Sequence, residues 1–191
     1  LLELMAREPR LCKHLHLPLQ SGCDKILQAM HRPYDTARFT QLLQQIRAQV
    51  PDVAITTDII VGFPGETEED FATTLAFAEK CGFAKMHIFP YSKRKGTPAE
   101  KMPNQVDEAV KGERAARLAA VDEKLHQAML KQMVGKTEEV LFEQPVDAVH
   151  MEGLCGPYLR VVAPGTSELS NTIAKVKITG RVDDWLTGEI V

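Results

Sequence analysis

The first 133 residues alternate between short apolar runs and stretches in which apolar residues recur every three or four positions. The short runs are rich in β-branched side chains, which predicts three strands, at residues 14–19, 53–61 and 83–89. The periodic stretches predict helices that follow Asp24, Asp35, Thr67 and Asn104. Strand–helix alternation of this kind is typical of a parallel sheet with right-handed crossovers.

Local signals mark where these elements begin and end. Asp35 can cap a helix through its side-chain oxygen, and Thr67-Glu-Glu-Asp70 is a capping-box sequence. Pro33 ends the helix before it, and Gly62-Phe63-Pro64-Gly65 predicts a turn between a strand and a helix. These signals fix the order of the elements in the first part of the chain.

The pattern becomes all-β after Gly135. Short β-branched runs are separated by turn residues, at 140–142, 158–163, 173–179 and 185–191. About 55 residues with this spacing fit a small five-stranded barrel. The sequence therefore predicts two domains, residues 1–133 and residues 134–191.

Composition and charge narrow the class of protein. The 191 residues are 44% hydrophobic and 26% charged, which excludes a disordered or fibrous chain. The net charge is −3, and residues 137–191 hold four basic and nine acidic residues, so this segment has no strong general attraction for phosphates. Four scattered cysteines do not suggest a disulfide framework, and we expect a cytoplasmic protein.

The first residues read like the middle of a helix, because Leu1 opens the run Leu-Leu-Glu-Leu-Met without an initiator methionine. Three parallel strands would also leave two unpaired sheet edges. We therefore expect a piece of a longer protein whose remaining part precedes Leu1.

Polar side chains gather where the predicted strands end, which is where ligands bind in parallel α/β folds. Gln20 and Ser21 follow the first strand, Asp58 lies near the end of the second, and Arg32 closes the next helix. Asp58 could accept hydrogen bonds from a ribose diol, and Arg32 could hold a carboxylate through two parallel hydrogen bonds.

Structural roles remain open for the same residues. Asp58 could be a satisfied carboxylate within an apolar strand, with Arg32 as its partner. His14 and His16 lie on the same side of a strand and could form a metal pair, but no third ligand follows at a recognisable spacing, which favours packing or hydrogen-bonding roles. Residues 62–67 lack the Gly-Lys-Ser/Thr ending of a phosphate-binding loop.

Three longer segments resemble the radical-SAM methylthiotransferases: His14-Leu-His-Leu-Pro-Leu-Gln-Ser-Gly22, Thr57-Asp-Ile-Ile-Val-Gly-Phe-Pro-Gly-Glu-Thr67 and Phe89-Pro-Tyr-Ser-Lys-Arg-Lys-Gly-Thr-Pro-Ala99. Residues 54–58, 89–94 and 105–110 look most like the branch that modifies threonylcarbamoyladenosine beside the tRNA anticodon. The isopentenyladenosine branch and the ribosomal-protein aspartate branch look less similar.

The resemblance implies an α/β fold: the C-terminal half of a radical-SAM partial (β/α) barrel followed by a small all-β TRAM barrel. It also implies S-adenosylmethionine as cofactor and two [4Fe–4S] clusters in the full-length enzyme. The cluster-binding cysteines of the family have no counterpart among Cys12, Cys23, Cys81 and Cys155, so we expect no metal ligands here and no activity from this stretch alone. By the same resemblance, S-adenosylmethionine contacts fall on Gln20, Arg32 and Asp58, with Ile60 at an adenine-packing position.

The resemblance further implies the tRNA anticodon stem-loop as partner, together with an N-terminal cluster domain and the first half of the barrel. We expect modest RNA contacts from the loop residues Lys93, Arg94 and Lys95 and from the barrel residues Tyr158, Arg160 and Lys175. A second hypothesis is an RNA- or partner-binding module without catalysis.

Overall fold

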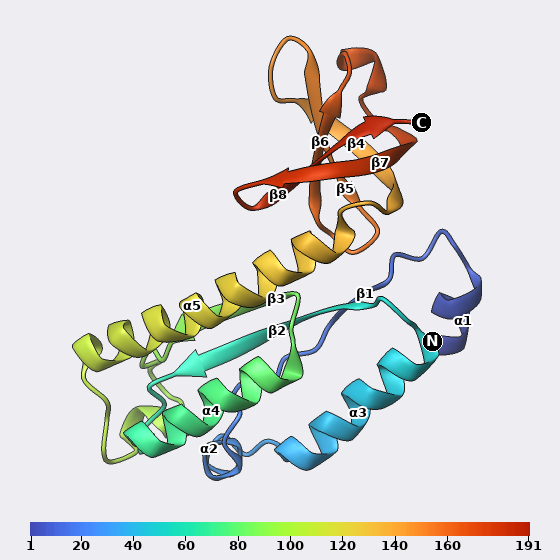
Figure 1. Cartoon of the computed structure of the whole chain (residues 1–191). Coiled ribbons are helices and arrows are strands. Elements are labelled where there is room, and N and C mark those ends of the chain that lie inside the picture. Colours follow the sequence, from blue (N-terminus) through green and yellow to red (C-terminus); the bar gives the residue numbers. More distant parts are fainter. The chain divides into compact units, whose positions relative to one another are not determined.

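The computed structural model describes residues 1–191, which form two compact units (Figure 1). The sheet unit contains Leu15–Pro51 and Ile55–Leu125, and the barrel unit contains Leu1–His14, Asp52–Ala54 and His126–Val191. The units divide within a helix, between Leu125 and His126. The boundary between residues 133 and 134, which rests on the change of sequence pattern, stays a prediction.

The sheet has the strand order β1 (His14–His16), β2 (Ala54–Val61) and β3 (Lys85–Pro90). Strands β2 and β3 are parallel, with Asp58 opposite His87, so the predicted α/β architecture is confirmed. Strand β1 is shorter than the predicted 14–19. Leu17 N–H still donates to the Thr56 carbonyl, but the Thr57 hydroxyl then donates to the Leu17 carbonyl and accepts from Leu19 N. Backbone pairing with β2 resumes at an isolated bridge between Gln20 and Ile59.

Two helices of the sheet unit, α3 and α4, begin where their caps predict. Helix α2 spans Asp24–Ala29, and α3 (Thr36–Gln49) starts after Asp35, whose side chain accepts a hydrogen bond from the Arg38 amide at 2.8 Å. Helix α4 (Glu68–Cys81) has the capping box between Thr67 and Asp70. Helix α5 (Glu108–Met133) starts four residues later than predicted, because Asn104 lies in a left-handed turn with φ +57° and its carbonyl accepts from Gly65 N.

Strand β2 has two different faces. Ile55, Thr57, Ile59 and Val61 are buried, and α3 and α4 lie together on one side of the sheet (Figure 1). The alternate residues Thr56, Asp58 and Ile60 are partly exposed on the opposite face, which we call the open face. The open face therefore carries the polar side chains of the strand.

The barrel unit contains a closed five-stranded barrel, as predicted, in the order β4-β5-β6-β8-β7. The strands are β4 (Thr137–Pro145), β5 (His150–Cys155), β6 (Arg160–Pro164), β7 (Thr172–Val182) and β8 (Trp185–Ile190). The sequence analysis missed β5, which contains Gly153. At Gly153 the two backbones approach so closely that a Cβ would lie 2.1 Å from the Leu141 carbonyl oxygen.

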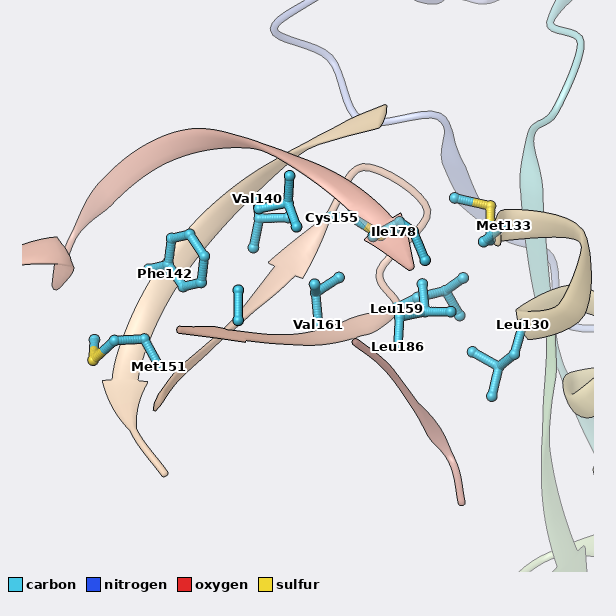
Figure 2. Close-up of a cluster of buried hydrophobic side chains, with 12 residues drawn as sticks. Leu130, Met133, Val140, Phe142, Met151, Cys155, Leu159, Val161, Ile178 and Leu186 are labelled. Carbon is cyan, nitrogen blue, oxygen red and sulfur yellow. The ribbon is translucent and has the colours of Figure 1, made fainter. Parts of the chain in front are cut away.

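The barrel interior is filled by apolar side chains from every strand, including Phe142, Met151, Val161 and Leu186 (Figure 2). Leu130 and Met133, from the last turns of α5, belong to the same buried cluster. The remaining elements are short: α1 (Leu2–Arg7) and two 3-10 turns, η1 (Pro98–Lys101) and η2 (Ser167–Leu169). Every helix of the chain is too short or too polar to serve as a membrane span.

Candidate cofactor-binding site

A cavity of about 680 Å³ lies within the sheet unit, at the carboxyl ends of the strands. We call it the strand-end cavity. Its lining comes from the Gln20 turn, the end of α2, strands β2 and β3 and the loop after β3: Gln20, Met30, Arg32, Asp58, Ile60, Phe63, Phe89, Pro90, Tyr91, Ser92, Arg94, Thr97 and Ala99. The structure thus brings four of the five predicted cofactor residues, Gln20, Arg32, Asp58 and Ile60, to one cavity.

The backbone holds Gln20 in a left-handed conformation, with φ +70°. Its N–H donates to the Asp58 carbonyl at 2.8 Å, and its carbonyl accepts from Ile60 N at 2.9 Å. Such a conformation is uncommon for a residue other than glycine and costs about 1–2 kcal/mol. The two sheet hydrogen bonds fix it, and so place the amide side chain at the cavity.

The fifth predicted residue, Ser21, does not line the cavity. Its side chain is fully buried, its hydroxyl lies 3.2 Å from the Thr74 hydroxyl, and it accepts a hydrogen bond from Cys23 N. Gly22 packs so tightly against α4 that a Cβ there would meet Phe77 Cβ at 2.8 Å. Ser21 therefore ties the turn to α4, on the side of the sheet away from the open face.

Arg32 and Asp58 do not pair with one another, so the structural alternative in which Arg32 is the partner of Asp58 does not hold. Asp58 Oδ2 lies 3.4 Å from His16 Nε2, and the Asp58 side chain is 28% exposed. Arg32 follows His31, whose φ of +54° turns the chain at the end of α2, and its side chain is exposed at the cavity. A guanidinium and a carboxylate thus face the same space without cancelling each other.

Aromatic and apolar side chains form another wall of the cavity. Phe63, from the Gly-Phe-Pro-Gly turn, packs edge-on against Tyr91, with ring centroids 5.3 Å apart, and Ile60 lies beside this cluster. The Tyr91 hydroxyl is buried and has no hydrogen-bond partner. A buried polar group of this kind costs free energy until it meets a donor or acceptor, so it suits a cavity that receives a polar ligand.

Buried charged side chains hold the turn that carries Phe63 in place. Gly62 has φ +72°, and its N–H donates to Glu66 Oε1 at 2.8 Å. Arg114 of α5 donates to the same oxygen at 2.7 Å. Burial raises the pKa of the Glu66 carboxyl, while the Gly62 amide and the Arg114 guanidinium oppose that rise. Lys111, 2% exposed, fills the space beneath Gly62.

The cysteines do not form a cluster site. Cys12 is exposed, and Cys23, Cys81 and Cys155 are separately buried. Burial raises the pKa of the Cys81 thiol to about 12 and that of the Cys155 thiol to about 11, which keeps both protonated. Three thiolates that could hold an iron–sulfur cluster do not meet anywhere in the chain.

A different trio of ligand-type side chains does meet, on the open face. His16, Asp58 and His87 place one ligand atom each within 4.8 Å of one another. The sequence analysis considered His16 but found no third ligand, because His87 belongs to another strand and becomes its neighbour only through the register of β2 with β3. His14 is instead in ring contact with Tyr158, within the barrel unit.

The proposed RNA-contacting residues fall into two groups. Lys93, Arg94 and Lys95 are exposed in the loop after β3, and Arg94 also lines the strand-end cavity. In the barrel unit, Tyr158 is 57% exposed. Arg160 pairs with Glu152 and lies over the Trp185 ring.

Lys175, the remaining barrel residue, is exposed on β7 opposite Glu139 of β4. The two groups of RNA-contacting residues therefore belong to different units, and they stay separate predictions.

Comparison with known proteins shows which proteins the chain resembles. Residues 1–78 match the family model of the radical SAM superfamily. The chain is 40% identical, over 93% of its length, to the threonylcarbamoyladenosine tRNA methylthiotransferase MtaB of Bacillus subtilis, of which it covers 40%. It is 48% identical, over 75% of its length, to a tRNA-2-methylthio-N(6)-dimethylallyladenosine synthase of Corynebacterium urealyticum, of which it covers 26%. A synthase with the same description from Thermoanaerobacter sp. is 42% identical over 95% of the chain.

The fold and these similarities relate the chain to radical SAM proteins, and its relatives named above are a tRNA methylthiotransferase and two tRNA-2-methylthio-N(6)-dimethylallyladenosine synthases. The chain spans about two fifths or less of each of these relatives. Radical SAM proteins use S-adenosylmethionine and iron–sulfur clusters. The strand-end cavity fits S-adenosylmethionine, since it offers an acidic, a basic and an amide side chain beside apolar walls, together with an unpartnered buried hydroxyl. The cysteines of this chain do not fit an iron–sulfur cluster.

Proposed function

We propose that this chain is the S-adenosylmethionine-binding and RNA-facing part of a tRNA methylthiotransferase that acts on N6-threonylcarbamoyladenosine next to the anticodon. The observation that carries the proposal is the convergence of Gln20, Arg32, Asp58 and Ile60 on one cavity at the strand ends. Ligands of parallel α/β proteins bind at this position. A tRNA substrate would place the reaction in the cytoplasm.

Each lining side chain has a part of the cofactor that it suits. Arg32 would hold the methionine carboxylate through charge-assisted hydrogen bonds, and Asp58 would accept from the ribose hydroxyls. Ile60 and Phe63 would pack against the adenine ring and exclude water from it, and Gln20 would hydrogen-bond a polar edge. When bound, S-adenosylmethionine supplies the methyl group and the chemistry that activates a C–H bond.

The chain's own residues would bind and orient that cofactor, and the iron–sulfur chemistry would come from residues outside this sequence. Cys12, Cys23, Cys81 and Cys155 do not meet one another, and three of the four thiols are buried and protonated. We therefore expect these 191 residues to bind the cofactor without turning it over.

Binding of S-adenosylmethionine tests the site directly. Isothermal titration of the 191-residue chain should give one site, and Arg32→Gln should weaken binding about tenfold or more, as expected for loss of a hydrogen bond to a charged group. Arg38→Gln, on the exposed surface of α3, is the matched control and should leave the affinity unchanged.

The methionine carboxylate can be tested separately with 5′-methylthioadenosine, which lacks it. Arg32→Gln should not change the affinity for this nucleoside, whereas Asp58→Asn should weaken both ligands through the ribose. Equal losses for both ligands in Arg32→Gln would contradict the assigned role of Arg32. Unchanged binding in all variants would contradict the site.

The nucleoside substrate can be determined in cells. Mass spectrometry of tRNA nucleosides after deletion of the whole gene should show loss of the methylthio group from threonylcarbamoyladenosine. The relatives named as dimethylallyladenosine synthases, at up to 48% identity, favour isopentenyladenosine as the second candidate, and its loss of the methylthio group would move the assignment there. An unchanged nucleoside profile would instead support a binding module without catalysis.

A further inference from the structure

His16, Asp58 and His87 lie side by side on the open face, one from each neighbouring strand segment. Their ligand atoms all fall within 4.8 Å of one another, and His16 Nε2 is 3.4 Å from Asp58 Oδ2. The two imidazole rings have centroids 5.7 Å apart. His16 and His87 do not line the strand-end cavity, whereas Asp58 lines it and is shared between the trio and the proposed cofactor contacts.

The backbone fixes where the three side chains point. Asp58 and His87 are direct register partners in the parallel pair β2–β3, and side chains opposite each other project to the same face. His16 belongs to β1, which pairs with the edge of β2 opposite to β3, and its Nδ1 is 3.0 Å from the Thr56 hydroxyl. That contact turns the imidazole so that Nε2, rather than Nδ1, faces Asp58.

The geometry points to a mononuclear binding site for a first-row divalent transition metal, with His16, Asp58 and His87 as its three protein ligands. Zinc–nitrogen and zinc–oxygen bonds of about 2.0–2.1 Å in a tetrahedron place neighbouring ligand atoms about 3.3 Å apart. The His16–Asp58 pair meets this value at 3.4 Å, and His87 reaches it by a small side-chain adjustment from within 4.8 Å.

The donor set selects the kind of cation. Two imidazoles and one carboxylate suit zinc, iron or cobalt, whereas magnesium and calcium prefer oxygen ligands throughout. The Thr56 hydroxyl plays the part of an outer-shell group that orients a ligating histidine. His16 and His87 are both exposed, so a bound ion keeps open coordination positions toward the open face.

An ordinary histidine–carboxylate pair elsewhere in the chain provides a matched control. His150 Nδ1 lies 2.9 Å from Asp147 Oδ2, and both side chains are exposed, but no third ligand joins them. If pairing with one carboxylate were enough to bind a metal, both places would bind. If the trio is required, only the open-face site does.

Titration of zinc into the 191-residue chain after treatment with a chelator tests the site. The experiment uses a Cys12→Ser background, because Cys12 is the exposed thiol. We expect one equivalent to bind and to raise the melting temperature. His16→Gln, Asp58→Asn and His87→Gln should each weaken binding more than tenfold, and Thr56→Val about tenfold. His150→Gln should bind as the unsubstituted chain does.

Cobalt gives a second readout of the ligands. Its visible absorption should show nitrogen and oxygen ligation, without the near-ultraviolet bands of thiolate ligands. Absence of stoichiometric binding, persistence in all three ligand variants, or an equal loss in His150→Gln would each overturn the inference. Circular dichroism of His87→Gln, at an exposed position, ensures that a loss of binding is not a loss of folding. Because His16 and His87 lie outside the strand-end cavity, their variants should still bind S-adenosylmethionine, which separates this result from the proposed function.

Discussion

The Arg114 guanidinium lies 2.7 Å from Glu66 Oε1, and both side chains are at most 5% exposed. Arg114 also donates to the Glu66 backbone carbonyl at 3.2 Å. Through Glu66, which accepts from Gly62 N, this buried pair connects α5 to the turn that carries Phe63. The wall of the strand-end cavity therefore depends on a helix that begins 42 residues after Glu66.

Breaking this pair should be costly, because a lone buried carboxylate remains. Arg114→Met should lower the free energy of unfolding by about 3–5 kcal/mol, measured by urea denaturation. Arg117→Met is the matched control. Arg117 is on the same helix, pairs with Glu68 at 2.7 Å and, like Arg114, lies over the Phe71 ring. Its side chain is 39% exposed, so its loss should be much smaller. Equal losses would mean that burial does not decide the strength of these pairs.

Gly62 cannot accept a side chain, for two reasons. Its φ is +72°, and an added Cβ would lie 2.4 Å from Cγ of the buried Lys111. Gly62→Ala should therefore cost about 1–2 kcal/mol for the backbone conformation and about 1–3 kcal/mol more for overpacking, in the same urea assay. Gly65→Ala, in the same turn at φ +84° with open space around it, should cost the backbone part alone. Similar values for the two variants would show that Lys111 can move aside.

Asp70 should make the stability depend on pH in the acid range. Burial alone would raise its pKa, but hydrogen bonds from Lys25, Thr67 and Cys23 outweigh that effect and lower the pKa of Asp70 from 3.8 to about 2. The stabilisation is therefore present above about pH 4 and is lost as the pH falls toward 2. Urea denaturation between pH 5 and 2 should show a steeper decline for the unsubstituted chain than for Asp70→Asn.

The Asp70 comparison has an internal control in Asp147. The pKa of Asp147 is also lowered, by the Val149 amide and His150, but its side chain is exposed. Asp147→Asn should leave the acid decline nearly unchanged. A decline of the same steepness in Asp70→Asn and in the unsubstituted chain would contradict the role assigned to the capping box.

Contacts to RNA phosphates should appear in the salt dependence of binding. Lys93→Gln with Lys95→Gln removes two exposed cations from the loop after β3 and should weaken binding of an anticodon stem-loop RNA. The slope of log affinity against log salt should fall by roughly one to two, since single-stranded and duplex contacts contribute about 0.7–0.9 each. Lys80→Gln with Lys124→Gln, on α4 and α5, should leave the slope unchanged. An unaltered slope in the loop variant would remove the loop from the RNA interface.

Local signals were enough to predict much of the fold. The Asp35 cap and the Thr67–Asp70 box place the starts of α3 and α4, because the side chains that satisfy a helix end are close in sequence. The alternation along β2 places Asp58 and Ile60 on one face for the same reason. Their common cavity with Arg32 follows from the rule that parallel strands end at one edge.

What the sequence did not predict depends on contacts between distant segments. Strand β5 was missed because Gly153 interrupts its apolar pattern, and that glycine is explained only by the approach of Leu141. Ser21 was assigned to the cavity, but Thr74 and the close packing at Gly22 hold it against α4. His87 joins His16 and Asp58 only through strand register, which no local pattern reveals.

Neighbouring strands of the closed barrel differ in the number of residues that they pair. Strands β4 and β7 are joined along six register pairs, whereas β6 and β8 meet through two, Val161 with Leu186 and Val162 with Thr187. We expect a barrel to open transiently where neighbouring strands share the fewest register pairs, which here is between β6 and β8. Amide protons there would exchange with solvent sooner than those between β4 and β7, and the barrel would unroll into a sheet that has β6 and β8 at its two ends.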